Sequence, residues 1–262
     1  MTIASATRRL TAAGCVYAEE EASILAEAAR TAAELDAMVA RRAAGTPLEH
    51  VVGWTDFRGL RLTVGEGVFV PRPRSGFLVE EAASLTRCMS GQSRPVVVVD
   101  LCCGVGAIGA ALAAEVPQVE LHGVDIDPRA VACAEQNLRD VGGVVHQGDL
   151  FTALPRRLRR RIDVAVASPP YVPTEKIRLL PPEAREFEPP VALDGGADGV
   201  DLVRRIARDA RRWLAPHGCL ALEVGDTQVE AAAAVLEELG YPTRAVTSEE
   251  YGSAVVTGRR PH

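Results

Sequence analysis

Hydrophobic positions recur at helical spacing over the first 45 residues and then change to short alternating runs. Apolar side chains in residues 1–45 lie three or four positions apart among Ala, Glu and Arg, which predicts about two helices that end near Gly45. Residues 51–70 alternate and are broken by glycines, which predicts a β-hairpin. The pattern returns to helical spacing over residues 75–87.

From residue 95 onward, short apolar runs alternate with helical patterns. The run 96–101 is almost entirely valine and has no polar face, as is typical of a parallel strand buried on both sides. Alternation of this kind predicts right-handed βαβ units and an α/β fold with a doubly wound, seven-stranded sheet. The other predicted strands are 120–124, 144–146, 162–167, 219–224, 243–247 and 253–257, and the helices are 108–114, 128–139, 202–214 and 229–239. A long Pro- and Glu-rich loop is expected at 172–199, where it could serve as a lid.

These patterns divide the chain into three parts. We expect an N-terminal helical segment over residues 1–45, a β-hairpin linker over 46–72 and a main α/β domain over 73–262. No apolar run approaches the roughly 20 residues that span a bilayer, and the first residues lack a continuous apolar signal region. The sequence therefore favours a cytoplasmic protein.

Composition and charge narrow the classes of function. The six cysteines form no CxxC pair, so buried free thiols are expected rather than a disulfide framework or a metal site. A net charge of −6 counts weakly against a nucleic-acid substrate, because nucleic-acid binders usually carry a basic surface. Two local basic runs, 156–161 and 204–212, are interpreted as a solvated loop and one face of a helix.

Acidic and glycine residues follow the first two strands of the predicted domain. Asp100 ends the first strand, Gly104 and Gly106 follow it, and Asp125 ends the second strand. The glycines allow close backbone approach to a ligand, and an acid in the position of Asp125 can accept both hydroxyls of a ribose. Residues 104–109 also satisfy GxGxxG, so dinucleotide binding is one alternative, and a turn without a ligand is another. An acid at Asp100 would repel a pyrophosphate but suits the cationic S-adenosylmethionine, which we therefore expect as cofactor.

The remaining cofactor contacts are expected along the same edge of the sheet. Asp149 follows the third strand, where its carboxylate could accept the adenine amino group, or could merely cap the next turn. The complete predicted cofactor site comprises Asp100, Cys102, Gly104, Gly106, Asp125, Ile126, Asp149, Leu150 and Ser168.

The fourth strand ends in Ser168-Pro169-Pro170-Tyr171, which we predict to be the catalytic residues. Two prolines fix the backbone and leave nearby carbonyl groups as acceptors without competing donors. A polar side chain at Ser168 and one such carbonyl could hold a planar amino group, while Tyr171 stacks on its π-face. Catalysis of this kind depends mainly on positioning a weak nitrogen nucleophile. A Pro-rich turn at a strand end is the alternative.

Taken together, these motifs resemble the release-factor (protein) glutamine N5-methyltransferases of the HemK/PrmC type. The resemblance runs from about Arg41 to the C-terminus. It implies a methyltransferase fold of the S-adenosylmethionine-dependent class and methylation of a glutamine side-chain amide in a peptide-chain release factor. It further implies that the helical segment 1–45 recognises the substrate, with no membrane partner and with nucleic acid involved only through the ribosomal machinery. The motifs that carry it are 45–53, 69–73, 78–80, 100–108, 123–125, 148–151, 168–171, 188–193, 195–199 and 222–228.

Three departures from the family pattern leave the acceptor open. Ser168 stands where the family has Asn, Ser75-Gly76 replaces Thr-Glu, and the helical segment is shorter than usual. The serine oxygen lies about one bond nearer the backbone, and a misplacement of about 1 Å can cost roughly 100-fold in rate. The alternatives are methylation of adenine in nucleic acid, methylation of a small-molecule amine, and a paralogue that binds cofactor with weak turnover. Arg72 and Glu188 are interpreted as exposed loop charges that could support the site.

Overall fold

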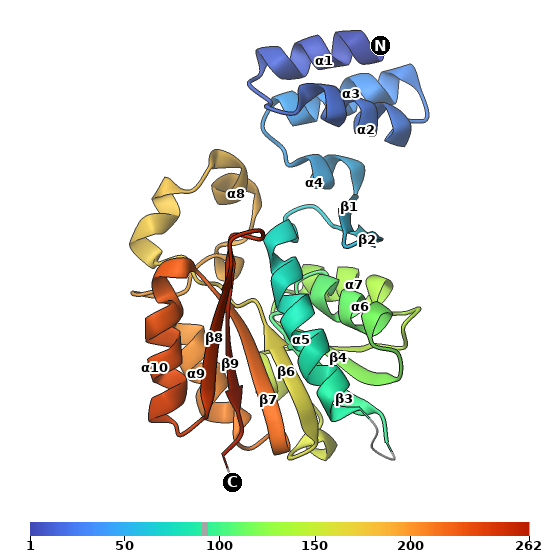
Figure 1. The fold of residues 1–262 in the computed structure, drawn as a ribbon. Helices are drawn as coiled ribbons and strands as arrows, with labels where there is room; N and C mark the ends of the chain where they lie inside the picture. Colours follow the sequence, from blue (N-terminus) through green and yellow to red (C-terminus); the bar gives the residue numbers. More distant parts are fainter. Residues whose placement is uncertain (91–93, 262) are drawn as a thin grey trace.

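The computed structural model describes residues 1–90 and 94–261, and its main body is a seven-stranded sheet with helices on both faces (Figure 1). The strand order is β5-β4-β3-β6-β7-β9-β8, with β9 antiparallel to both of its neighbours. The doubly wound α/β architecture expected from the sequence is therefore confirmed. The strands are β3 Val96–Leu101, β4 Val119–Asp125, β5 Val144–Gln147, β6 Ile162–Ala167, β7 Leu214–Val224, β8 Thr243–Ser248 and β9 Ser253–Arg259.

Two apolar cores lie on opposite faces of this sheet. Alternate residues of β3 point to opposite sides, so that Val96 and Val98 join one core and Val97 and Val99 join the other. The first core is closed by α5 (Gly76–Met89), α6 (Ala107–Glu115) and α7 (Pro128–Asn137). The second is closed by α9 (Asp201–Ala210) and α10 (Val229–Glu238). Both faces of the central strands are thus dry, which explains their continuous β-branched runs.

The direction in which strands are added reverses between β3 and β6. From β3 the chain moves outward through β4 to β5, and it then returns to the other side of β3 as β6. Helices diverge at such a point, so the carboxyl ends of β3, β4 and β6 surround an open crevice. Ligands of doubly wound sheets bind in this crevice.

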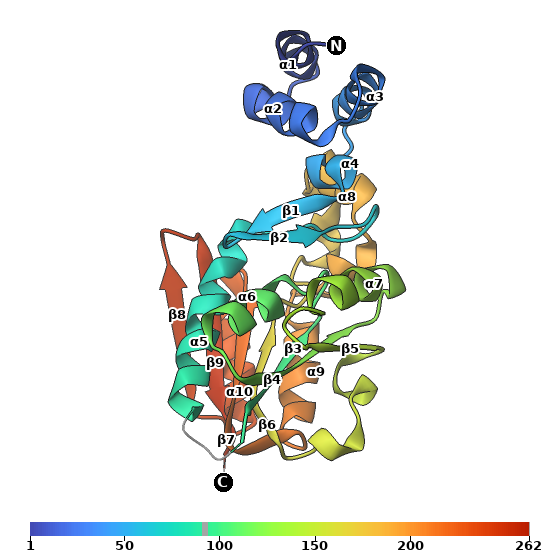
Figure 2. The same cartoon turned by 90° about the vertical axis from the view of Figure 1, so that its right-hand side faces the viewer.

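The N-terminal segment is a helical layer with its own small core (Figure 2). It contains three helices where about two were expected: α1 Ile3–Ala12, α2 Ala18–Ala28 and α3 Ala32–Ala43. A fourth, α4 Leu48–Val52, occupies residues where the predicted hairpin was to begin, and Gly53 ends it with a φ of 83°. The hairpin is therefore shorter than expected: β1 Trp54–Phe57 pairs with β2 Leu60–Thr63.

Other boundaries also differ from the prediction. The predicted helix 202–214 stops at Ala210, because Leu214 already pairs with Ile162 at the start of β6. The expected loop 172–199 contains a short helix, α8 Pro182–Phe187, and the 3-10 turns Thr174–Leu179 and Pro190–Ala192. All six cysteines are free, but Cys88 is exposed, so the expectation of buried thiols is wrong there. In the part of the chain that the structure describes, no helix is both long and apolar enough to cross a membrane.

The candidate cofactor and acceptor site

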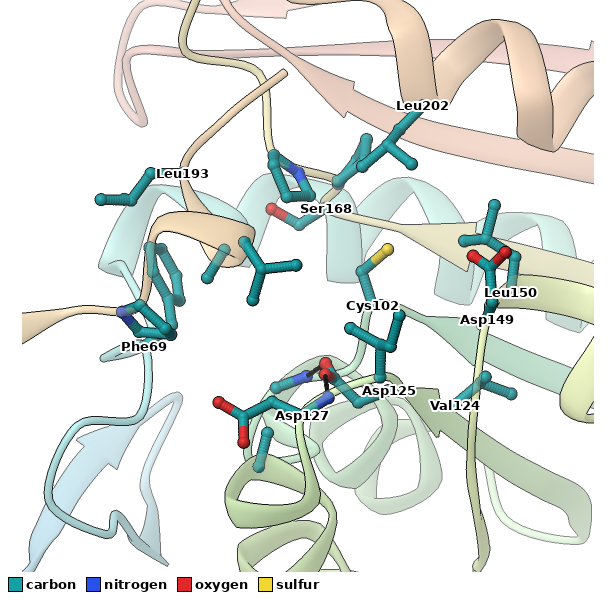
Figure 3. A pocket seen from close by; sticks show the side chains of 18 of the residues that line it. Phe69, Cys102, Val124, Asp125, Asp127, Asp149, Leu150, Ser168, Leu193 and Leu202 are labelled. Carbon is teal, nitrogen blue, oxygen red and sulfur yellow. Dashed lines mark hydrogen bonds between the residues drawn. The ribbon is translucent and has the colours of Figure 1, made fainter. Parts of the chain in front are cut away.

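A cavity of about 150 Å³ opens at the carboxyl ends of β3, β4, β5 and β6 (Figure 3). In Figure 3, Phe69 and Leu193 lie on one side of the cavity, whereas Asp149 and Leu150 lie on the other. Ten of the residues predicted from the sequence line it: Cys102, Gly104, Asp125, Ile126, Asp149, Leu150, Ser168, Pro169, Pro170 and Tyr171.

Asp125 is fixed by backbone donors at the end of β4. Its Oδ2 accepts the Gly104 N–H at 2.8 Å, and its Oδ1 accepts the Asp127 N–H at 2.9 Å. Burial raises the pKa of this carboxyl, while the backbone donors oppose that rise. Asp125 lines the cavity, and each carboxylate oxygen can accept more than one hydrogen bond, so the group can also accept the hydroxyls of a ligand.

Asp100, at the end of β3, is completely buried and does not line the cavity. Its Oδ2 accepts the Gly109 N–H in the first turn of α6 at 3.0 Å, whereas its Oδ1 has no hydrogen-bond partner. Burial raises its pKa to about 7, with a smaller contribution from Asp125. A buried carboxylate oxygen without a partner is costly, and a nearby cation or donor would relieve that cost.

The loop between β3 and α6 holds a tight left-handed backbone. Cys102 has a φ of 54°, which is unusual for a residue with a side chain, and its sulfur points into the cavity (Figure 3). Burial raises the pKa of this thiol, so it stays protonated. Gly106, with a φ of 81°, does not line the cavity; a Cβ there would lie 3.0 Å from Leu138. Gly106 thus allows close packing, and Gly104 lines the cavity itself.

Asp149 follows β5 and forms an ion pair with Arg205 of α9. The Oδ2–Nη2 distance is 2.5 Å, and each side chain is nearly half exposed. Both residues line the cavity. Among the described residues, no side chain or backbone group bonds to Oδ1 of Asp149, so this oxygen can accept an amino group while Arg205 orients the carboxylate.

Ser168, Pro169 and Pro170 follow β6 at the cavity wall, and the next residue, Tyr171, is half-buried. The Gln228 side chain fixes this turn, because its Nε2 donates to the Tyr171 carbonyl oxygen at 2.6 Å. The Gln228 Oε1 accepts the Gly225 N–H at 3.0 Å. A buried amide therefore ties the acceptor turn to the end of β7.

Arg74 covers the aromatic ring of Tyr171. Its guanidinium lies 4.8 Å from the ring centre and also donates to the Tyr171 hydroxyl. The same guanidinium lies 3.4 Å from Oε1 of Glu223, which is completely buried and whose Oε2 has no hydrogen-bond partner. Arg74 thus bridges a buried acid and the acceptor tyrosine, a connection that the sequence pattern did not reveal.

Arg72 and Glu188 form an ion pair next to the Tyr171 turn, in the wall of an adjoining groove. The Arg72 Nη2 lies 2.5 and 2.7 Å from the two Glu188 oxygens, and the Val70 N–H donates to the same carboxylate at 3.3 Å. Glu188 is only 4% exposed, so its interpretation as an exposed loop charge is wrong. Burial raises its pKa, whereas Arg72 lowers it.

The departure at Gly76 has a local explanation. A Cβ at this position would lie 2.9 Å from the Tyr251 ring and 3.2 Å from Arg58 Nη1. The Tyr251 hydroxyl in turn donates to Glu80 at 2.6 Å. A larger residue at position 76 would displace the Tyr251 ring. The ring therefore occupies the space that a side chain such as the family's glutamate would need.

A second, open groove of about 840 Å³ continues from the cavity toward the N-terminal helices. The two share Phe69, Tyr171, Val172 and Leu193 as walls. The far wall includes Val16 and Tyr17, between α1 and α2, whose side chains are 86% and 66% exposed. The groove is several times larger than the cavity and ends at the acceptor turn.

Several lining residues escaped prediction. Leu202 and Arg205 reach the cavity from α9, and Pro189, Val191 and Leu193 come from the predicted loop. Their positions depend on how α9 packs and on how the loop folds back. The Val172 N–H donates to the Leu193 carbonyl at 3.0 Å, which carries Leu193 over the cavity. Phe69, Pro189 and Leu193 belonged to motifs noted in the sequence (69–73 and 188–193), but no local signal assigned them to the site.

The charge and the hydrogen-bonding groups of this site fit S-adenosylmethionine. Two carboxylates, Asp100 and Asp125, lie at the ends of adjacent strands, and one oxygen of Asp100 is buried without a partner. A diol can bind directly to Asp125, which lines the cavity, and a positive charge on the same ligand would stabilise the buried Asp100 carboxylate through space, whereas a pyrophosphate would be repelled. The apolar lining from Val124, Leu150 and Leu202 suits an adenine ring.

Comparison with known proteins agrees with this chemistry. The family model "Methyltransferase small domain" matches residues 80–180. The chain is 40% identical to the release factor glutamine methyltransferase of Streptomyces coelicolor over 240 residues, covering 86% of this chain and 84% of the relative. It is 34% identical to the 4-amino-L-phenylalanine/4-methylamino-L-phenylalanine methyltransferase of Streptomyces pristinaespiralis, covering 86% of this chain and 76% of that one.

Solved structures share the fold at lower identity. A methyltransferase from Pyrococcus furiosus superposes with a TM-score of 0.56 at 15% identity, covering 87% of this chain and 98% of that chain. Because the match to the Streptomyces coelicolor enzyme exceeds 30% identity over most of both chains, it shows membership of a family and not only a shared fold. The chain therefore belongs to the release factor glutamine methyltransferase family and is an S-adenosylmethionine-dependent N-methyltransferase.

Proposed function

We propose that the methyl acceptor is the side-chain amide of a glutamine in a peptide-chain release factor. The observation that carries this proposal is the open groove of about 840 Å³ that leads from Tyr17 to Tyr171. A groove of this size that ends at the cofactor cavity suits an extended protein segment better than a small molecule. The release factor glutamine methyltransferase of Geobacter sulfurreducens, 36% identical over 225 residues, supports the same acceptor. With this acceptor, a cytoplasmic location is part of the proposal.

The residue roles follow from the geometry. When bound, S-adenosylmethionine supplies an electrophilic methyl group. Asp125 would accept the ribose hydroxyls, Asp149 the adenine amino group, and Asp100 would balance the positive charge through space. Cys102, Gly104, Ile126 and Leu150 would form the walls around the cofactor, and Gly106 would maintain the turn.

Ser168 and the Pro-Pro turn would hold the acceptor amide. The amide nitrogen is a weak nucleophile, so its alignment with the methyl group contributes most of the rate. Ser168 would accept one amide hydrogen through its hydroxyl oxygen. The carbonyl oxygen of Pro169 would accept the other, because proline leaves no neighbouring N–H to compete for it. Tyr171 would flank the amide plane and Leu193 would exclude water.

The division of labour between domains is part of the proposal. Residues 1–45 would recognise the protein substrate, 46–72 would link the parts, and 73–262 would carry the chemistry. The groove supports this division, because one wall comes from the N-terminal helices and the other from the acceptor turn.

Methyl transfer from labelled S-adenosylmethionine to purified release factor tests the acceptor. We expect label on the glutamine of its Gly-Gly-Gln loop, and a change of rate in Ser168→Asn. A gain of about tenfold or more in that variant would show that serine weakens an inherited activity, whereas a loss would show that the site is adapted to serine. If no label is transferred while calorimetry shows cofactor binding, the release-factor acceptor is wrong.

A second acceptor class is favoured by one relative. The Streptomyces pristinaespiralis enzyme, at 34% identity, is named for an aromatic amine carried on an amino acid. Arg72 and Arg74 line the groove beside Tyr171, and the guanidinium N–H groups that do not contact Glu188, Glu223 or Tyr171 could bind an amino-acid carboxylate. The same assay with 4-amino-L-phenylalanine in place of the release factor distinguishes the two, since each acceptor predicts label on a different product.

A further inference from the structure

Nine arginines gather at the end of the sheet opposite the cofactor cavity. They belong to the segment before β6, the turn between α9 and β7, and the residues at the end of β9. In Figure 1 this end of the sheet lies at the bottom, next to the C-terminus. We call this set the basic pole: Arg156, Arg157, Arg159, Arg160, Arg161, Arg211, Arg212, Arg259 and Arg260.

Hydrogen bonds to backbone carbonyl groups hold the three segments side by side. The Arg161 N–H donates to the Trp213 carbonyl at 3.1 Å, which joins the first segment to the second. The Arg260 guanidinium donates to the Leu214 carbonyl at 2.8 Å, which joins the third segment to the second. These contacts bring the three segments together at one end of the sheet, although the members of the basic pole are up to about a hundred positions apart in sequence.

The charge of the basic pole is not neutralised. Among the residues that the structure describes, no carboxylate lies within 4 Å of any of its nine guanidinium groups. Arg94, at the same end of the sheet, instead pairs with the buried Asp163 at 2.6 Å. Burial lowers the pKa of Arg260, and repulsion from Arg160 and Arg211 lowers it further. Eight of the nine side chains are exposed, so their fields add outside the protein.

Phosphate groups match this surface better than a lipid bilayer does. Arginine pairs with phosphate through its planar fork of donors, and a row of arginines fits a phosphate backbone. Peripheral membrane binding also needs exposed apolar side chains that enter the bilayer. Every exposed large hydrophobic side chain of the described residues lies outside the three segments.

We propose that the basic pole is a docking surface for the phosphate backbone of a nucleic acid, separate from the methyl-transfer site. The six residues of β6 separate Arg161 from Ser168, a span of roughly 20 Å along an extended strand. A nucleic acid bound at the basic pole is therefore an anchor and not the methyl acceptor. The overall charge of −6 does not oppose this, because the acidic excess lies elsewhere on the chain.

Fluorescence anisotropy with labelled 20-base-pair RNA and DNA duplexes tests the proposal across a KCl series. We expect binding that weakens steeply with salt, by about 0.9 in log–log slope for each phosphate contact. The triple variant Arg157→Gln/Arg160→Gln/Arg211→Gln should reduce affinity at least tenfold and lower the slope by about 2 to 3. Binding of one duplex type only would identify the source of the phosphates and support the proposal equally.

Matched controls distinguish binding at the basic pole from an effect of the protein's overall charge. Arg8→Gln/Arg139→Gln/Arg178→Gln removes three exposed arginines outside the basic pole and should leave binding unchanged. Tyr171→Ala should also bind normally, and calorimetry with S-adenosylhomocysteine verifies that each variant is folded. The proposal is overturned if neither duplex binds at 50 mM KCl, if the control triple loses as much affinity, or if Tyr171→Ala abolishes binding. Binding to phosphatidylserine vesicles without binding to either duplex would overturn it as well.

Discussion

Asp100 shows how one buried side chain can couple cofactor binding to pH. Its folded-state pKa is about 7, above the ordinary value of 3.8. The neutral form is therefore favoured in the folded protein, and as pH rises from about 4 to 7 the unfolded chain loses its proton first. Stability of the cofactor-free protein should fall over this window, because the charged form must be buried.

A cationic cofactor offsets the free-energy cost of burying the ionised Asp100 carboxylate. We predict that the affinity for S-adenosylmethionine increases as pH rises from 6 to 8, by at most about tenfold per pH unit below pH 7, since the ionised carboxylate stabilises the positive ligand. Calorimetry in buffers of different ionisation enthalpy should show proton release on binding near pH 6.5. Asp100→Asn should remove this proton release, and the idea fails if the variant retains it.

Arg74 offers a test of positioning at the acceptor end. Arg74→Gln frees the Tyr171 ring, so we expect kcat to fall by about 10- to 100-fold with little change in cofactor affinity. The same change also leaves the buried Glu223 without its cation, which lowers the free energy of unfolding. The double variant Arg74→Gln/Glu223→Gln should recover stability but not kcat. If kcat recovers together with stability, Arg74 is only structural.

At the scale of elements, the turn that ends β6 depends on a glycine far away in sequence. Gly199 has a φ of 83°, and a Cβ there would lie 2.0 Å from Gln228 Nε2 and 2.3 Å from the Tyr171 carbonyl oxygen. Any side chain at 199 would therefore break the hydrogen bond that holds Tyr171.

We predict that Gly199→Ala lowers the free energy of unfolding by about 3 kcal/mol and nearly abolishes methyl transfer, because strain and steric overlap add. Gly240→Ala is the matched control: its φ is 78°, but nothing lies within 4 Å of the added Cβ. It should cost about 1 kcal/mol from backbone strain alone and leave kcat unchanged. Denaturant midpoints and initial rates measure both, and equal losses in the two variants would contradict the steric explanation.

The elements that the sequence predicted well are those with a strong local signal. β3 and β6 were recognised at their true boundaries, since a run such as Val96–Leu101 has one stable environment. The residues at the ends of these strands lie around the cavity because parallel strands bring their carboxyl ends together. Arg205, Leu193 and Arg74 were not predicted, because their place depends on packing between elements that are distant in sequence. The start of β7 was missed for the same reason: pairing with β6 overrides the local helical pattern.

At the scale of the whole molecule, the N-terminal helices are joined to the catalytic part by few polar contacts. Among the described residues, Arg42 of α3 makes such a contact with Glu183 of α8 at 3.3 Å, and its pair with Glu21 of α2 at 2.7 Å fixes it within the N-terminal helices. A Cβ on Gly45 would lie 3.9 Å from Phe187 of the same helix. The groove between these parts is therefore shaped by both, and its width depends on their relative placement.

Tyr17 lies at the far end of this groove and gives a test of how much of the substrate is recognised there. We predict that Tyr17→Asp raises KM for a release factor by about 10- to 100-fold through loss of an apolar contact, with kcat and cofactor affinity unchanged. Ile3→Asp is the control, since Ile3 is 49% exposed but does not line the groove. Steady-state kinetics compare the two, and a similar KM in both variants would argue against recognition at Tyr17.

The order of strands in the sheet has a consequence for folding during translation on the ribosome. β9, the last strand along the chain, lies between β7 and β8 rather than at an edge. While residues 253–259 are still inside the exit tunnel, β7 and β8 lack the strand that pairs with both of them. The unpaired backbone N–H and C=O groups along the edge of β7 are then exposed to solvent. The sheet can close only after this segment has been translated and has left the tunnel, so we expect nascent chains to depend on chaperones until then.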